Sequence, residues 1–132
     1  MIFMEKISQD NNLFKRIEAQ ENAARQFGFY WSNIDELITQ IQSECIEIQE
    51  AWQSGEKKHL EEEIGDLLLA SISLAIFCDL DPQITLCKST EKFQKRYNSL
   101  VELAHTDGYS ELKQQSVEVL MSYWKRAKQL SI

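Results

Sequence analysis

Two acidic clusters, residues 44–47 and 63–66, contain the side chains of this sequence that are best suited to chemistry. Each cluster places two carboxylates three residues apart, so both would lie on one face of a helix. Carboxylates within about 5 Å of one another repel by roughly 3 kcal/mol per pair at an effective dielectric near 20, so a cation is expected among them. The four acids are Glu44, Glu47, Glu63 and Asp66.

The residue types in the clusters indicate which cation they would hold. Sets of carboxylates prefer hard cations, so we expect Mg²⁺, with Mn²⁺ able to replace it. The only histidines are His59 and His105, so neither cluster has the Glu-x-x-His spacing of helical di-iron sites or the ligands that zinc favours. Because Mg²⁺ usually keeps several waters and is completed by substrate phosphates, a polyphosphate substrate is expected.

A row of basic residues further along the chain could bind such a substrate. Lys88, Lys92 and Arg96 recur every four residues, so a helix would present them on one side, where they could neutralise phosphate oxygens. A basic row alone is more often an ordinary surface, and a single Glu-x-x-Glu is more often a solvated helix face. Two acidic clusters on adjacent segments, followed by this row, favour a binding site for metal and polyphosphate.

The elements that must position these residues are all expected to be helices, because long stretches repeat apolar residues at helical spacing. One proline and four glycines leave few breaks, and Ser54-Gly55 is the clearest stop between the acidic clusters. It predicts two antiparallel helices that bring the clusters face to face. We expect an all-α bundle of four to five helices, at about 10–27, 33–53, 56–79, 82–105 and 116–129, with residues 1–9 as a loose end.

The third of these helices is apolar almost all round after Asp66, which is typical of the buried centre of a bundle or of a helix shared with a partner subunit. Cys45 and Cys78 lie in apolar helical surroundings, where buried reduced thiols are common. Trp31, at a helix start, and two other tryptophans, at helical core positions, are expected to pack rather than to contact a ligand.

The whole-chain numbers favour one domain of 132 residues. A formal net charge of −7 argues against a nucleic-acid backbone or an anionic membrane as the main partner. The apolar stretch 67–80 is too short to span a bilayer, and the N-terminus lacks the apolar core of a signal peptide. With three cysteines that have no metal-ligand spacing, these features predict a cytoplasmic protein.

The acidic pattern, with its context, resembles that of MazG-like nucleotide pyrophosphohydrolases, in the all-α NTP pyrophosphatase superfamily. Three further segments are similar to that family: residues 62–68 around the second cluster, residues 92–97 in the basic row, and residues 116–128 near the C-terminus. The likeness covers about residues 20–130.

This resemblance implies hydrolysis of nucleoside triphosphates to monophosphate and pyrophosphate with Mg²⁺, by water attacking the α-phosphorus. It also implies a four-helix core that is usually paired into dimers, so a homodimer or a dimer of dimers is expected. Lys92 and Arg96, next to Lys88, would bind the triphosphate, and either Glu47 or Glu63 would accept the proton of the water. By the same resemblance, the metal ligands would be Glu44, Glu47, Glu63 and Asp66.

Two alternatives stay open from the sequence. A relative could cleave another pyrophosphate linkage, such as that of phosphoribosyl-ATP, or act on deoxynucleotides alone. A catalytically silent helical interaction module could keep the acidic clusters for stability or regulation, and the apolar third helix would suit such a role. The base, the sugar and the number of metal ions are not determined by the sequence.

Overall fold

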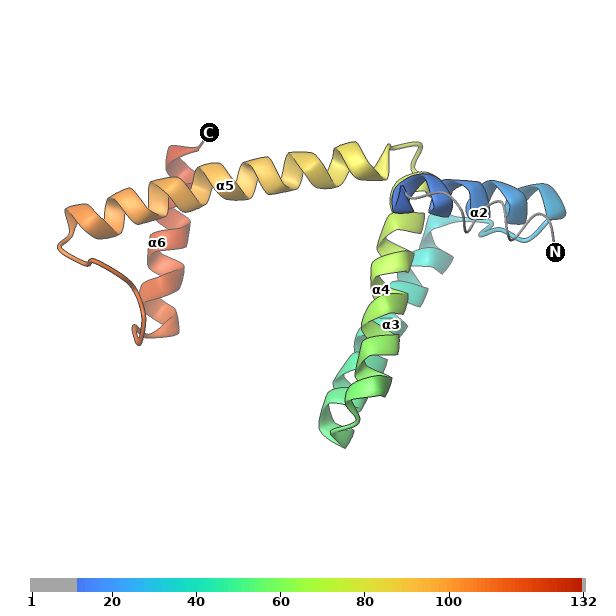
Figure 1. Ribbon diagram of the computed structural model, residues 1–132, viewed down its shortest axis with the longest axis horizontal. Coiled ribbons are helices and arrows are strands. Elements are labelled where there is room, and N and C mark those ends of the chain that lie inside the picture. The colour runs from blue at the N-terminus through green and yellow to red at the C-terminus, as the bar shows by residue number, and fades with distance from the viewer. Residues whose placement is uncertain (1–11, 132) are drawn as a thin grey trace. The chain divides into compact units, whose positions relative to one another are not determined.

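A computed structural model describes residues 12–131, and this part of the chain is helical with no strand (Figure 1). The all-α prediction is therefore confirmed, and the predicted helix bounds agree to within a few residues. The predicted loose end, residues 1–9, lies outside the described residues. The helices are α2 (Leu13–Phe27), α3 (Ile34–Ser54), α4 (Lys57–Phe77), α5 (Pro82–Thr106) and α6 (Val117–Leu130).

The helices begin and end where the sequence provides capping residues. Asn12, Asn33 and Ser116 precede α2, α3 and α6, and the side chain of each accepts a hydrogen bond from a backbone N–H in the first turn. Gly28 and Gly55 follow α2 and α3 with φ angles of +102° and +77°, in the left-handed region that glycine adopts without strain. These local signals fix the segments that carry the acidic residues.

The chain forms two compact units, one ending at Gln83 and the other beginning at Ile84. In the first unit, α3 and α4 run antiparallel side by side and are joined by the tight turn at Gly55, as predicted (Figure 1). Helix α2 lies against the other end of this pair, where the Ser73 hydroxyl of α4 donates a hydrogen bond to the Glu21 carboxylate of α2. The antiparallel pair is the element that positions both acidic clusters.

In the second unit, α6 is tied to the end of α5 by Asp107. The Asp107 carboxylate accepts hydrogen bonds from the Tyr123 hydroxyl at 2.8 Å and the Arg126 guanidinium at 2.9 Å. These two donors, Arg126 first, lower the pKa of Asp107 below its ordinary value. The rings of Phe93 and Trp124 lie 5.6 Å apart and add an aromatic contact between the two helices.

The burial predicted for the central helices is largely wrong. Within α4 only Ser73 is buried, whereas Leu68 and Leu69 are 61% and 45% exposed. Cys45 and Cys78, predicted to be buried thiols, are also exposed. In its own unit α4 packs along α3 and meets α2 at one end, and neighbours on two sides cannot cover a helix that is apolar all round. The remaining interpretation, a helix shared with a partner subunit, stays a prediction.

The apolar character of α4 does not make it a membrane span. None of the helices between residues 12 and 131 is both long enough and apolar enough to cross a bilayer.

Candidate metal centre

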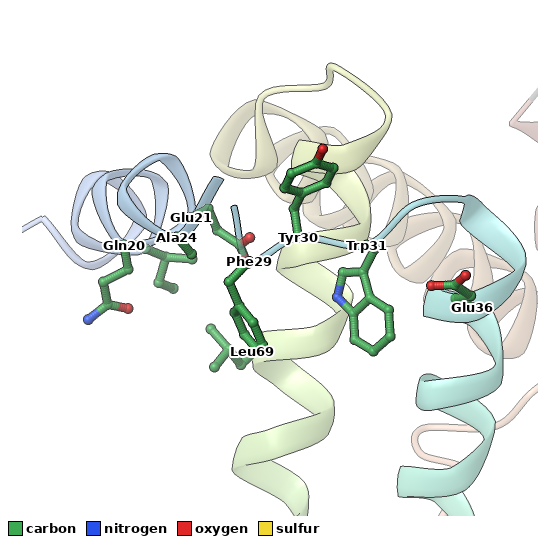
Figure 2. Close-up of a pocket in the computed structure, with 9 residues that line it drawn as sticks. Gln20, Glu21, Ala24, Phe29, Tyr30, Trp31, Glu36 and Leu69 are labelled. Atoms are coloured by element: carbon green, nitrogen blue, oxygen red, sulfur yellow. The ribbon is translucent and has the colours of Figure 1, made fainter. Parts of the chain in front are cut away.

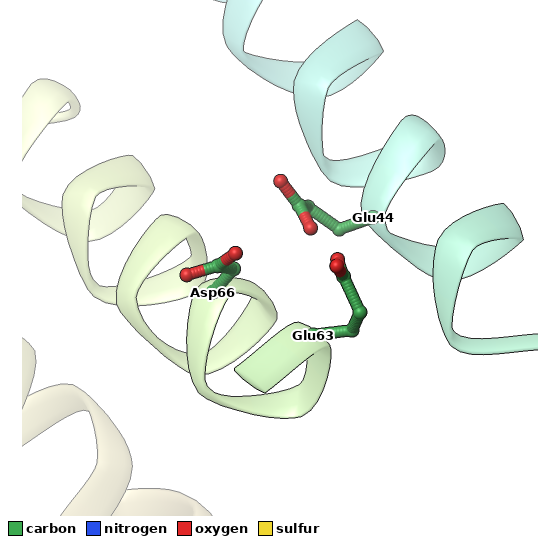
Figure 3. A group of neighbouring side chains, drawn as sticks. All are labelled: Glu44, Glu63 and Asp66. Atoms are coloured by element: carbon green, nitrogen blue, oxygen red, sulfur yellow. The ribbon is translucent and has the colours of Figure 1, made fainter. Parts of the chain in front are cut away.

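Three of the four predicted carboxylates converge between α3 and α4. One oxygen from each of Glu44, Glu63 and Asp66 lies within 4.8 Å of the other two. Figure 3 shows Glu44 reaching from α3 toward Glu63 and Asp66, which lie one turn apart on α4. The three-residue spacing places the acids of a cluster on one face of their helix, and the antiparallel pairing turns the two faces toward each other.

Two oxygen atoms in this group lack the partners that buried polar atoms normally have. Glu44 is only 6% exposed. One carboxylate oxygen of Glu44 and one of Glu63 are buried and have no hydrogen-bond partner among the described residues. The other oxygen of Glu44 accepts a hydrogen bond of 2.7 Å from the Gln40 side chain. Buried ionised oxygens are costly unless a donor or a cation compensates them. The donor set, three carboxylates facing one gap, fits a hard divalent cation.

The fourth predicted ligand, Glu47, lies beside this group rather than within it. Its pKa is raised above the ordinary value, chiefly because protonated Glu47 can donate a hydrogen bond to the Glu63 carboxylate. Hydrogen bonding with Glu44 acts in the opposite direction. Glu47 therefore shares the electrostatic environment of the three converging acids and binds a proton more readily than an isolated glutamate.

His59 lies close to the group, one helical turn before Glu63. Its Nδ1 atom is 3.7 Å from a Glu63 carboxylate oxygen, and the His59 side chain is largely exposed. The spacing of four residues on α4 accounts for this contact, which fits the expectation that His59 lies near the Glu63 face. An imidazole there can orient the Glu63 carboxylate.

The predicted basic row belongs to the second unit. Lys88 and Lys92 are exposed on α5, and Arg96 is partly buried, with its Nε atom lacking a hydrogen-bond partner among the described residues. The spacing of four residues places all three on one side of this helix, as expected. Their position beside the carboxylates stays a prediction.

A cavity adjoins the carboxylate group inside the first unit. It has a volume of about 210 Å³, and both Glu44 and Asp66 line it, together with Gln40 and Ser73. A second cavity of about 440 Å³ lies between α2, the loop that follows it and α4 (Figure 2). Trp31 and Leu69 line both cavities.

The second cavity has little signal in the amino-acid sequence. Trp31, expected to pack at the start of α3, also lines both spaces. The only local signal is the run of aromatic residues 29–31 in a loop between two helices. Helical periodicity carries no information about such a loop, because its cavity depends on how three elements meet.

The amino-acid sequence is similar to those of a known family and of several named proteins. The MazG nucleotide pyrophosphohydrolase domain family matches residues 32–101, which include both acidic clusters and the basic row. A nucleoside triphosphate pyrophosphohydrolase/pyrophosphatase MazG from Thermotoga maritima is 38% identical over 109 residues, covering 83% of this chain and 41% of that protein. A nucleoside triphosphate pyrophosphohydrolase from Escherichia coli K12 is 28% identical over 119 residues, covering 89% of this chain and 45% of that protein. The chain thus spans less than half the length of these relatives.

Proposed function

Because this chain belongs to the MazG nucleotide pyrophosphohydrolase family, we propose that it hydrolyses nucleoside triphosphates to nucleoside monophosphate and pyrophosphate with Mg²⁺. The observation that carries the proposal is the convergence of Glu44, Glu63 and Asp66, with two buried oxygens that lack a partner among the described residues. The names of the two relatives support the same reaction.

In this proposal Glu44, Glu63 and Asp66 hold the metal ion. When bound, Mg²⁺ would neutralise phosphate oxygens and increase the acidity of water. The side chain of Gln40 donates a hydrogen bond of 2.7 Å to one oxygen of Glu44 and so orients that carboxylate. The chain therefore supplies a preorganised negative site, whose mutual repulsion is relieved only when a cation enters.

Glu47 is the better candidate for the proton acceptor. It lies outside the three converging acids, so its carboxylate is not fully committed to the metal. An ionised carboxylate in this position can accept the proton that an attacking water must lose. In the proposed reaction Glu47 takes this proton as water attacks the α-phosphorus. Glu63, the alternative acceptor, keeps the role of metal ligand.

The basic row on α5 would bind the triphosphate and stabilise the leaving pyrophosphate. Lys92 and Arg96, with Lys88 one turn earlier, carry the positive charges that such an anion requires. The unpartnered Nε atom of Arg96 supports this role, because a guanidinium normally donates to an acceptor.

A homodimer or a dimer of dimers is part of the proposal, because α4 exposes large apolar residues that a second copy could cover. The cytoplasmic location inferred from the sequence stays a prediction. Cleavage of another pyrophosphate linkage, such as that of phosphoribosyl-ATP, and a silent interaction module remain the alternatives.

The direct test is pyrophosphate release from a panel of nucleoside triphosphates with Mg²⁺, for the wild type and for Glu63→Gln and Asp66→Asn. We expect each substitution to lower kcat/KM by at least about 100-fold, since losing a metal ligand should cost no less than losing a supporting hydrogen bond. Glu61→Gln, an exposed acid on the same helix, is the matched control and should keep activity. Unchanged turnover in both site variants would refute the assignment.

A further inference from the structure

The two cavities of the first unit are neighbours that share lining residues. Trp31 and Leu69 line both, and the hydrogen-bonded pair of Glu21 and Ser73 joins them, because Ser73 lines the smaller cavity and Glu21 the larger one. The smaller cavity ends at the converging carboxylates. The larger cavity is therefore the neighbouring space in which the nucleoside of a nucleotide could lie if its phosphates lay at those carboxylates.

The lining of the larger cavity suits a planar aromatic ligand. Phe29, Tyr30 and Trp31 line it from the loop between α2 and α3. In Figure 2 the Phe29 ring lies beside Leu69 and the Trp31 ring points to the same side, whereas the Tyr30 ring points the other way. Stacking on aromatic side chains is a common way to hold a nucleobase, since every base presents a flat face. The volume of about 440 Å³ lies within the range of small-molecule sites.

The charged groups among the described residues of this cavity are both carboxylates, and the Gln20 amide beside them can donate as well as accept. Glu21 and Glu36 line it, and no Lys, Arg or His is among the lining residues that belong to the described part of the chain. One oxygen of Glu36 already accepts from the Ser32 hydroxyl at 2.6 Å and from Asn33 at 3.1 Å. Glu21 accepts from Ser73, and an ionised carboxylate keeps further acceptor sites.

Of these two acids, Glu21 is the better placed to read a base. It is partly buried, it comes from α2, and its bond to the buried Ser73 fixes its carboxylate at the junction of the two cavities. Arg25, the nearby cation, stacks over the Tyr30 ring at 5.4 Å and is not among the residues that line the cavity.

We propose that this cavity holds the nucleobase and that Glu21 selects bases with an exocyclic amino group, adenine, cytosine and guanine, over uracil and thymine. This inference rests on the proposed function. A carboxylate accepts a hydrogen bond from an amino group, whereas it repels the carbonyl oxygens that flank the single ring N–H of uracil and thymine. A base that leaves the carboxylate unpaired in the cavity binds less well.

The test compares pyrophosphate release from ATP, CTP and GTP with that from UTP and dTTP. The wild type should favour the amino-bearing bases by about 10-fold or more in kcat/KM, as expected for one unsatisfied polar contact. In Glu21→Gln, whose amide can also donate, the ratio of CTP to UTP should fall toward one. Glu18→Gln, one turn earlier on α2 and not among the lining residues, is the matched control and should keep the wild-type ratio.

A second measurement separates this inference from the proposed reaction. Cytidine and uridine, which carry no phosphate, are titrated against the metal-free protein by tryptophan fluorescence. If no triphosphate is cleaved but cytidine binds more tightly than uridine, and Glu21→Gln removes the difference, the reaction is wrong and the base site stands. If triphosphates are cleaved with equal kcat/KM for all five bases, the base site is overturned and the reaction stands. Where no triphosphate is cleaved, equal or absent binding of the nucleosides also overturns the base site.

Discussion

At the scale of single residues, the arrangement of Glu44 and Glu63 is unfavourable for the isolated protein. Both have a buried carboxylate oxygen without a partner among the described residues, and they face each other and Asp66 across a gap of less than 5 Å. Stability alone would favour neutral side chains at such positions. Carboxylates at positions where neutral side chains would be more stable are therefore evidence for a functional role.

Replacing Glu44 with Gln should stabilise the metal-free protein, because it removes one buried charge and its repulsion with the two neighbours. We expect the free energy of unfolding without metal to rise by about 1 kcal/mol. Thermal unfolding in the presence of a chelator measures this change. Glu50→Gln, an exposed acid on the same helix, is the control. A lower melting temperature for Glu44→Gln would mean that its ionised carboxylate is needed for stability.

Arg96→Ala should act mainly on substrate binding. If its guanidinium holds the triphosphate in both the ground state and the transition state, KM rises by about 10-fold while kcat changes less. Lys113→Ala, which removes a largely exposed side chain with only a neighbouring Glu111 as its ion-pair partner, provides the comparison. An unaltered KM for Arg96→Ala would remove this residue from the substrate site.

At the scale of elements, the link between α5 and α6 predicts a defined pH dependence. Hydrogen bonds from Arg126 and Tyr123 lower the pKa of Asp107 below its ordinary value of 3.8. The stabilisation is therefore present when the pH is above that ordinary value and is lost as the pH falls through the lower folded-state pKa. Asp107→Asn should reduce the melting temperature at pH 7, and the difference from the wild type should shrink below about pH 4. A difference that is constant with pH would show that the charge of Asp107 is unimportant.

Helix positions were predictable because their signals are local. Asn33 and Gly55 define the ends of α3 through hydrogen bonds and a φ angle that involve only a few neighbouring residues. The convergence of Glu44 with Glu63 also followed from sequence, since one tight turn and helical geometry suffice to produce it. The exposure of Cys45 was not predictable in this way, because an apolar stripe shows which face tends to avoid water and not whether another element covers it.

The position of Trp31 between two cavities was not predictable, for a related reason. Its loop connects α2 and α3, and its cavity also requires Leu69 of α4. A sequence pattern in one segment cannot show that three segments enclose a space. Such sites become visible only when the packing of the elements is known.

At the scale of the whole molecule, helix α4 of the first unit exposes several large apolar side chains that a stable soluble protein would normally cover. On α4, Leu68 and Leu69 are 61% and 45% exposed, and Ile64 on the same helix is 41% exposed. Exposed patches of this kind usually mark an interface. A second copy of the chain is the occupant that the proposed function implies.

Substituting Leu68 with Glu should weaken this assembly. The wild type should behave in analytical ultracentrifugation as a species of at least twice the chain mass of 15.4 kDa. Leu68→Glu should shift it toward the monomer, because a charge buried in an apolar interface without a partner is costly. Gln53→Glu adds the same charge at an exposed polar site on α3 and should leave the mass unchanged. A monomeric wild type would contradict the dimer directly.

The measurement that tests the central claim most directly is the melting temperature of the protein as a function of Mg²⁺ concentration. A cation that binds only the folded carboxylate group should stabilise the wild type by about 2.7 kcal/mol at a concentration 100 times its Kd, and Glu63→Gln should respond far less. A wild-type melting temperature that stays flat up to millimolar Mg²⁺, or a rise that is equal in Glu63→Gln, would contradict the claim that these acids form a metal site.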